Sequence, residues 1–288
     1  MSRIVVQKRT FGTLRWILIA VLVVATAFPF YYMVELSFVP IEQVLLHPDR
    51  LWIPIENFTL QTYANVLKSQ DDGGQGFAQF MMNSAIVAIA CAAITLLVAI
   101  PGSYAISRLK FFGRRQISAL FLAVYLFPVI IIAIPLFVGF SALGIRESLV
   151  GLVIVYIAQT IPVSIHMLRS YLRSIPQSVE EAAMVDGAGR LRILWKITIP
   201  LAMPSIISTG LYVFMIAWNE FLFALLFLAA DRDLWTVSLG LSQLSNGIEV
   251  SKTVLMAGSV LLTIPIIVLY GLTERSLTEG LTSGADKG

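Results

Sequence analysis

Six long apolar stretches constrain this chain more than any other feature. A helix that crosses a bilayer needs about 20 consecutive, mostly apolar residues. Six segments of the 288-residue sequence meet that requirement: 16–38, 84–106, 118–140, 149–168, 205–229 and 253–272. Charged residues make up only 13% of the chain, against about 25% in a typical soluble domain. A chain with so few charged residues is predicted to fold within a lipid bilayer.

The apolar stretches favour helices over a transmembrane β-barrel. Barrel strands alternate apolar and polar residues, whereas these segments are apolar on every face. We predict an all-α membrane protein with about six transmembrane helices. Its transmembrane domain covers residues 16–272, between an N-terminal segment of residues 1–15 and a C-terminal tail of residues 273–288.

The first stretch has a second interpretation. Basic residues precede an apolar core that is followed by Ala25-Thr26-Ala27, a pattern that resembles a signal-peptidase site. The apolar character nevertheless continues to Val34, which gives the length of a full span. We favour a membrane anchor over a cleaved leader.

The distribution of lysine and arginine predicts the orientation. Cytoplasmic segments carry the excess of these residues. With the N-terminus inside, 15 of the 20 lie in the inner segments and five in the outer ones. We expect a multi-pass protein of a bacterial or archaeal cytoplasmic membrane, with both termini in the cytoplasm. Residues 39–83 then form an outer loop and residues 169–204 an inner loop.

The inner loop contains a short predicted helix over 179–186. Ser178 and Glu181 have the spacing of a capping box. Pro176 disfavours helix upstream, and Gly187 suits a left-handed stop. A helix of about two turns is marginal in water and needs a partner surface. A second short helix is expected over 190–198.

Two interpretations of this loop follow from the residues alone. Ala182 and Ala183 carry almost no side chain, so that another protein's backbone could approach closely. The loop would then be a docking element. It could equally be an interfacial elbow that reconnects two spans. The residues themselves do not separate these two alternatives.

A family resemblance favours docking. Glu181-Ala182-Ala183, three further residues, Gly187, nine further residues and Ile197-Thr198-Ile199-Pro200 resemble the loop motif of permeases in ATP-binding-cassette importers. Ile199 stands where the motif usually has Leu. The surrounding loop from Arg173 to Ala188, and three shorter motifs, are similar to the maltose-type carbohydrate branch. These motifs are Ser103-Tyr104-Ala105-Ile106-Ser107-Arg108, Ala217-Trp218-Asn219-Glu220 and Gly280-Leu281-Thr282-Ser283-Gly284-Ala285.

The resemblance implies a type I importer permease fold in which the inner loop is the coupling helix. The residues implied to contact an ATPase are Ser178, Glu181, Ala182, Ala183, Asp186 and Gly187. The implied partners are a second homologous permease, two ATP-binding-cassette ATPase subunits and an extracytoplasmic sugar-binding protein. ATP and Mg²⁺ would be bound by the ATPases. This chain lacks the phosphate-cradling G-x-x-x-x-G-K-[ST] loop, so we expect it to bind no cofactor itself.

Polar residues inside the apolar stretches are candidates for a substrate pathway, because polar groups at membrane depth are costly. The candidates are Asn83, Gln159, Trp218, Asn219 and Glu220. Aromatic, amide and acid groups suit a ligand rich in hydroxyls. Hydrogen bonds between helices are the alternative, and we favour that alternative.

Other function classes are disfavoured by what the sequence lacks. Two histidines and the lone Cys91 give no metal or catalytic constellation, so that an intramembrane enzyme is not expected. A net charge of +3 with basic residues beside apolar runs gives no sign of nucleic-acid binding. An ion-coupled secondary transporter would need more membrane-embedded acids than Glu220. An importer permease for a non-sugar solute stays open as an alternative.

Overall fold

A computed structural model describes residues 3–46, 52–126, 128–246 and 251–282, and within these ranges the regular structure is helical throughout. The chain divides into two compact units, residues 1–77 with 243–261 and residues 78–242 with 262–288. Two helices run through the division: α12 (Val237–Asn246) and α13 (Lys252–Thr282). The all-α prediction is confirmed.

The first unit contains α1 (Arg3–Ser37), α2 (Ile41–Leu46), the 3₁₀ turn η1 (Ile55–Asn57) and α3 (Gln61–Leu67). The Glu35 carboxylate is buried and accepts a hydrogen bond from the Ile53 backbone N–H at 2.6 Å. Ser37 and Tyr63 share a hydrogen bond of 2.7 Å. The segment after α1 therefore folds back onto the end of that helix.

Most of α1 presents apolar side chains to its surroundings. Trp16 is 63% exposed and Val24 is 66% exposed. Contiguous apolar surface on this scale marks contact with a membrane or a partner. Residues 12–37 are long and apolar enough to cross a bilayer, as predicted for the first span.

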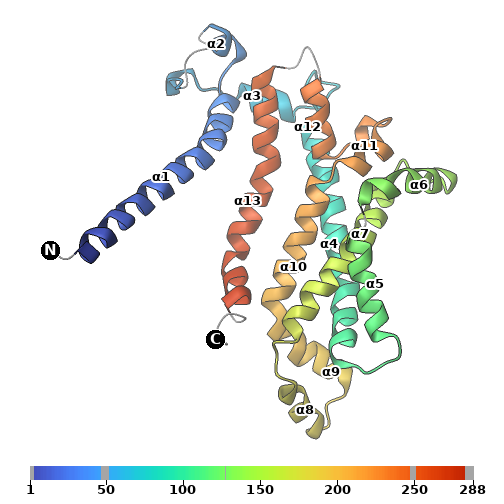
Figure 1. Ribbon diagram of the computed structural model, residues 1–288. Helices are drawn as coiled ribbons and strands as arrows, with labels where there is room; N and C mark the ends of the chain where they lie inside the picture. The colour runs from blue at the N-terminus through green and yellow to red at the C-terminus, as the bar shows by residue number, and fades with distance from the viewer. Residues whose placement is uncertain (1–2, 47–51, 127, 247–250, 283–288) are drawn as a thin grey trace. The chain divides into compact units, whose positions relative to one another are not determined.

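The second unit is a bundle of long helices. Figure 1 shows α4 (Phe77–Arg108), α5 (Arg114–Leu126), α7 (Leu149–Leu172) and α10 (Ile199–Asn219) side by side. At one end of the bundle lie α8 (Gln177–Val185) and α9 (Arg190–Ile193), and at the other lie α6 (Val129–Ala142) and α11 (Leu222–Leu228). We call these the α8 end and the α11 end.

The core near the α8 end joins α4, α7 and α10. Tyr104 from α4, Leu168 from α7 and Ala202 from α10 all belong to one buried apolar cluster. Leu194, from the π-helical turn η2 (Leu194–Thr198), belongs to the same cluster. This apolar packing holds together the end of the bundle at which α8 and α9 lie.

The predicted third span, residues 118–140, is not one helix. It consists of α5, with 13 residues, and α6, with 14. Pro128 precedes α6 with an extended ψ of 118°, and proline lacks the backbone N–H that a continuous helix would use there. By length and composition, five helical runs of the described chain can cross a membrane, and α6 is a shorter apolar helix.

The predicted fifth span also ends earlier than expected. Residues 205–229 were expected as one helix, but α10 stops at Asn219 because Glu220 is extended, with ψ 133°. The helix resumes as α11. In the other direction, α9 and η2 continue directly into α10, so that 190–219 form one run of 30 residues. The predicted helix over 190–198 is therefore the first part of a span.

Candidate functional site

The helix α8 is the centre of the candidate site, and its start differs from the prediction. Pro176 takes the N-cap position, with no side-chain hydrogen bond to the first turn. Proline already fixes φ and disfavours helix in the residue before it, so that the helix starts at Gln177 without a capping side chain. Ser178 is consequently inside the first turn. The predicted capping box between Ser178 and Glu181 is wrong.

The end of α8 is as predicted. Gly187 has φ +81°, a conformation that costs L-residues free energy and glycine very little. Its N–H bonds the Met184 carbonyl at 3.1 Å, and the Ala188 N–H bonds the Ala183 carbonyl at 2.9 Å. This pair of bonds is a Schellman motif. It turns the chain from α8 toward α9.

Glu180 ties α8 to the bundle, and the sequence reasoning missed it. The Arg108 Nε donates to Glu180 Oε1 at 2.9 Å, and both side chains are almost fully buried. Tyr104 and Thr198 donate further hydrogen bonds of 3.3 Å to the same carboxylate. Arg108 also donates to the Ile175 carbonyl at 2.9 Å. One carboxylate thus joins α8, α4 and η2.

The neighbouring residue, Glu181, points elsewhere. Successive helical residues are rotated by about 100°, so that only one of two adjacent glutamates can face the bundle. Glu180 is buried while Glu181 is exposed. A signal for this division was present in Arg108, a basic residue that directly follows a long apolar run. Its buried charge requires an acid partner.

The outward face of α8 is small and apolar. Ala182 is exposed and Ala183 half-buried, while Val179, Met184 and Val185 also lie on the surface. Asp186 and Glu181 are the exposed acids of this segment. The short helix therefore has an exposed apolar face and is held to the bundle at its back by a buried ion pair.

A second cluster lies where α10 breaks. The Glu220 carboxylate accepts from the backbone N–H of Phe223 at 3.0 Å and of Ala224 at 3.3 Å, and thereby satisfies the first turn of α11. The Tyr156 hydroxyl of α7 donates to Glu220 Oε2 at 2.5 Å. Glu220 therefore lies at the junction of α10 and α11, where its carboxylate bonds both the first turn of α11 and α7.

The remaining pathway candidates are dispersed. The Trp218 indole N–H donates to the Leu262 carbonyl at 3.0 Å, and exposed Asn219 donates to the Met215 carbonyl at 2.8 Å. Asn83 is buried and donates to the carbonyls of Asp233 at 2.7 Å and Trp235 at 2.9 Å. It therefore fastens the segment after α11 onto α4.

Gln159 is different from these residues. It lies on α7, one turn beyond Tyr156, and its side-chain Nε2 is buried with no hydrogen-bond partner in the described part of the chain. An amide donor left in this state costs free energy until it finds an acceptor. Within the same described ranges, no group of three His, Cys, Asp or Glu side chains could hold a metal ion.

Comparison with known families identifies the class of protein. The model of the family described as binding-protein-dependent transport system inner membrane component matches residues 98–278, which include α8 and both bundle ends. The chain belongs to this family. An inner membrane component of such a system is a transport permease, and the apolar helices described above make this one a multi-pass protein of the cytoplasmic membrane.

Curated relatives of this permease align over nearly the whole chain. The inner membrane ABC transporter permease protein YcjP of Escherichia coli is 37% identical over 94% of this chain and 94% of its own. The trehalose/maltose transport system permease protein MalG of Thermococcus litoralis is 36% identical over 91% of each. The trehalose transport system permease protein SugB of Mycobacterium tuberculosis is 31% identical over 95% of this chain and 97% of its own.

A solved structure shares the fold. The crystal structure of a bacterial ABC transporter involved in the import of the acidic polysaccharide alginate contains a chain that superposes with a TM-score of 0.80. The match covers 96% of this permease and 99% of that chain, at 24% sequence identity. The importer permease fold is thereby shown.

Proposed function

We propose that this permease is one of two homologous membrane subunits that form the pathway of an ATP-driven carbohydrate importer. Relatives named for the transport of trehalose/maltose, trehalose, diacetylchitobiose and sulfoquinovosyl glycerol support a carbohydrate cargo. A di- or oligosaccharide or a polyol is the cargo class that we assign.

The observation that carries the proposal is the construction of α8. Its back is fixed to two other segments by Glu180, and its front presents Val179, Ala182 and Val185. A two-turn helix is too short to be stable alone, and an apolar front needs a cover. A groove on an ATPase subunit would supply that cover, with Glu181 and Asp186 at its rim.

The energy for transport would come from partner ATPase subunits. Two ATPase subunits would bind ATP and Mg²⁺ and hydrolyse the ATP, and an extracytoplasmic binding protein would deliver the sugar. The 15-to-5 distribution of basic residues supports an orientation with α8 and both termini in the cytoplasm. Closure of the ATPase pair would move α8, and the Arg108–Glu180 pair would pass that movement to α4 as a rigid-body rotation.

Gln159 is the residue that we propose for cargo contact. Its Nε2 has no hydrogen-bond partner among the described residues and can donate to a sugar hydroxyl, whereas Asn83 and Trp218 already donate to backbone carbonyls. Glu220 and Tyr156 would hold the helix junction beside the pathway rather than the cargo.

The test uses the complete transporter in proteoliposomes, with ATP inside and radiolabelled sugar delivered outside by the binding protein. The test variant is Glu181→Lys, an exposed charge reversal on α8. The control is Glu147→Lys, a charge reversal just before α7 and outside α8, whose side chain is 49% exposed and pairs with the adjacent Arg146. We expect uptake and sugar-stimulated ATP hydrolysis to fall at least about tenfold in Glu181→Lys, since one misplaced contact at a coupling interface costs more than 1.4 kcal/mol. Unchanged coupling in Glu181→Lys and also in Gly187→Asp would contradict the proposal.

A further inference from the structure

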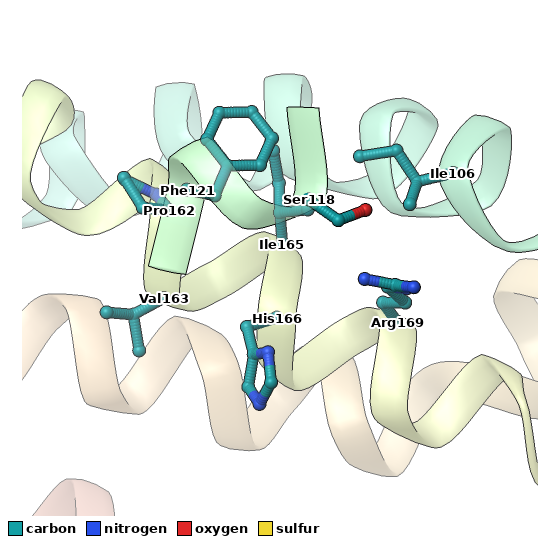
Figure 2. Close-up of a pocket in the computed structure, with 8 residues that line it drawn as sticks. All are labelled: Ile106, Ser118, Phe121, Pro162, Val163, Ile165, His166 and Arg169. Atoms are coloured by element: carbon teal, nitrogen blue, oxygen red, sulfur yellow. The ribbon is translucent and has the colours of Figure 1, made fainter. Parts of the chain in front are cut away.

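Two adjoining hollows lie at the α8 end of the bundle, away from the outward face of α8. The first is a pocket of about 200 Å³ between α4, α5 and α7. Its walls are mainly apolar and come from Ile106, Phe121, Pro162, Val163 and Ile165. Figure 2 shows Phe121 and Pro162 at one end of this pocket and Arg169 at the other, with the Ser118 hydroxyl between them.

The second hollow is a wider basin of about 560 Å³ that opens beside the first. Four arginines line it, two from the start of α5 and two from the end of α7: Arg114, Arg115, Arg169 and Arg173. Ser118 and Arg169 line both hollows. The two spaces therefore form one site with an apolar end and a strongly cationic end.

The cationic end is not neutralised by the protein. In the described part of the chain the ion pairs are Arg108–Glu180 and Arg146–Glu147, and neither involves an arginine of the basin. The Arg169 Nε is buried without a hydrogen-bond partner among those same residues. Arg114 uses its guanidinium on the carbonyls of Leu109 and Ser107, so it adds no negative group. Arg115 and Arg173 are exposed and can be hydrated, whereas Arg169 is half-buried, and a buried guanidinium atom without a partner favours the entry of an anion.

An aromatic tip adjoins the basin. Phe112 is completely exposed and Phe111 is 40% exposed, in the turn that Gly113 makes between α4 and α5 with φ +86°. Both phenylalanines line the basin with the arginines. Exposed phenylalanines beside basic residues are typical of segments that lie at the interface between the acyl chains and the head groups of a membrane.

We propose that this is a binding site for an anionic phospholipid. The phosphate of the head group pairs with Arg169, Arg173 and Arg114, and guanidinium groups bind phosphate oxygens with two parallel hydrogen bonds. The start of an acyl chain enters the apolar pocket against Phe121 and Ile165. Basic pockets between membrane helices recognise acidic lipids by this combination. A soluble phosphate would fill only the cationic end and leave the apolar pocket unoccupied.

The test places the complete transporter in nanodiscs of phosphatidylcholine with a minor fraction of phosphatidylglycerol that carries a diazirine on one acyl chain. Irradiation and peptide mapping locate the labelled residues. The test variant is Arg169→Gln with Arg173→Gln, and the matched control is Arg190→Gln with Arg192→Gln, a pair of exposed arginines that lines neither hollow. Photoactivatable phosphatidylcholine is the zwitterionic comparison, whose choline cation cancels the charge of its phosphate.

We expect the phosphatidylglycerol probe to label α5 and α7 around Phe121 and Ile165, and the phosphatidylcholine probe to label them weakly. Loss of two arginines at the head group should lower this labelling about tenfold, while the control pair leaves it unchanged. A competition on the unaltered protein makes the result independent of variant folding: excess unlabelled phosphatidylglycerol should suppress the labelling and excess phosphatidylcholine should not. Equal labelling by both probes, or labelling that is insensitive to the two arginines, would overturn the proposal. Suppression by millimolar inorganic phosphate would overturn it too, since that result assigns the site to a soluble anion.

Discussion

Arg108 and Glu180 form an ion pair of 2.9 Å in which both side chains are about 5% exposed, and they are 72 positions apart in the chain. Arg108 ends the long helix α4, while Glu180 lies in the middle of α8. The pair therefore links the loop that contains α8 to a helix long and apolar enough to span a membrane. It lies behind the exposed face of α8, so that its observed role is to hold α8 on the bundle.

Removing one member of this pair should destabilise the permease. Glu180→Gln keeps the size of the side chain but leaves the Arg108 guanidinium buried without a counter-charge, and breaking a buried pair in this way costs about 3–5 kcal/mol. We expect a clear fall in the thermal unfolding midpoint of the purified complex. The double variant Arg108→Met with Glu180→Leu should recover most of that stability, because an apolar pair needs no counter-charge. A single variant as stable as the parent would contradict the structural role of the pair.

Gly187 and Gly189 offer a matched comparison in the loop after α8. Gly187 has φ +81°, whereas Gly189 has φ −72°, and a Cβ built on either meets no atom within 4 Å. Alanine at Gly187 should cost about 1–2 kcal/mol from backbone strain alone, and alanine at Gly189 should cost much less. The measurement is sugar-stimulated ATP hydrolysis together with thermal unfolding. Equal effects of the two substitutions would show that the turn conformation does not matter.

The hydrogen bond between Tyr156 and Glu220 should stabilise the break between α10 and α11. Tyr156→Phe removes a donor to a carboxylate, an interaction worth about 1.5–3 kcal/mol. Tyr171→Phe is the control on the same helix, because its hydroxyl makes only a long bond of 3.4 Å to the Leu201 carbonyl at an exposed position. Thermal unfolding should distinguish the two variants. An equal loss of stability in both variants would show that the hydrogen bond between Tyr156 and Glu220 does not stabilise the break.

Asn83 and Gln159 should respond differently to removal of the amide. Asn83→Ala breaks two hydrogen bonds to the segment after α11 and should lower stability by about 1–3 kcal/mol, with little change in the KM for transport. Gln159→Ala removes an amide whose Nε2 has no hydrogen-bond partner in the part of the chain that the structure describes, so it should leave stability nearly unchanged and raise the KM. Transport kinetics and thermal unfolding, measured on both variants, check the pair. If Asn83→Ala instead raised the KM and Gln159→Ala lowered stability, the cargo contact would be assigned to Asn83.

The sequence predicted the long helices and the short inner helix because apolar length and Gly187 are local signals. It did not predict the break after Asn219, since residues 221–229 are as apolar as a span and the reason for the break is the hydrogen bonding of Glu220 to α11 and Tyr156. The different roles of Glu180 and Glu181 were not predicted either, because Arg108 indicates that an acid partner is needed but not which glutamate it is. Only the folded chain brings Arg108 to α8.

The central claim is that α8 contacts a partner ATPase. Cys91 is the only cysteine in the sequence and is buried, so a Cys91→Ala background allows one reactive thiol to be placed at will. Val185→Cys puts it on α8, at a position 88% exposed, and Leu143→Cys puts it after α6, at a position 71% exposed. A short bifunctional cross-linker should join Val185→Cys to an ATPase subunit and leave Leu143→Cys unlinked to it. Should Val185→Cys react only with lipid-soluble reagents and never with an ATPase, α8 would be an interfacial elbow and the coupling account would be wrong.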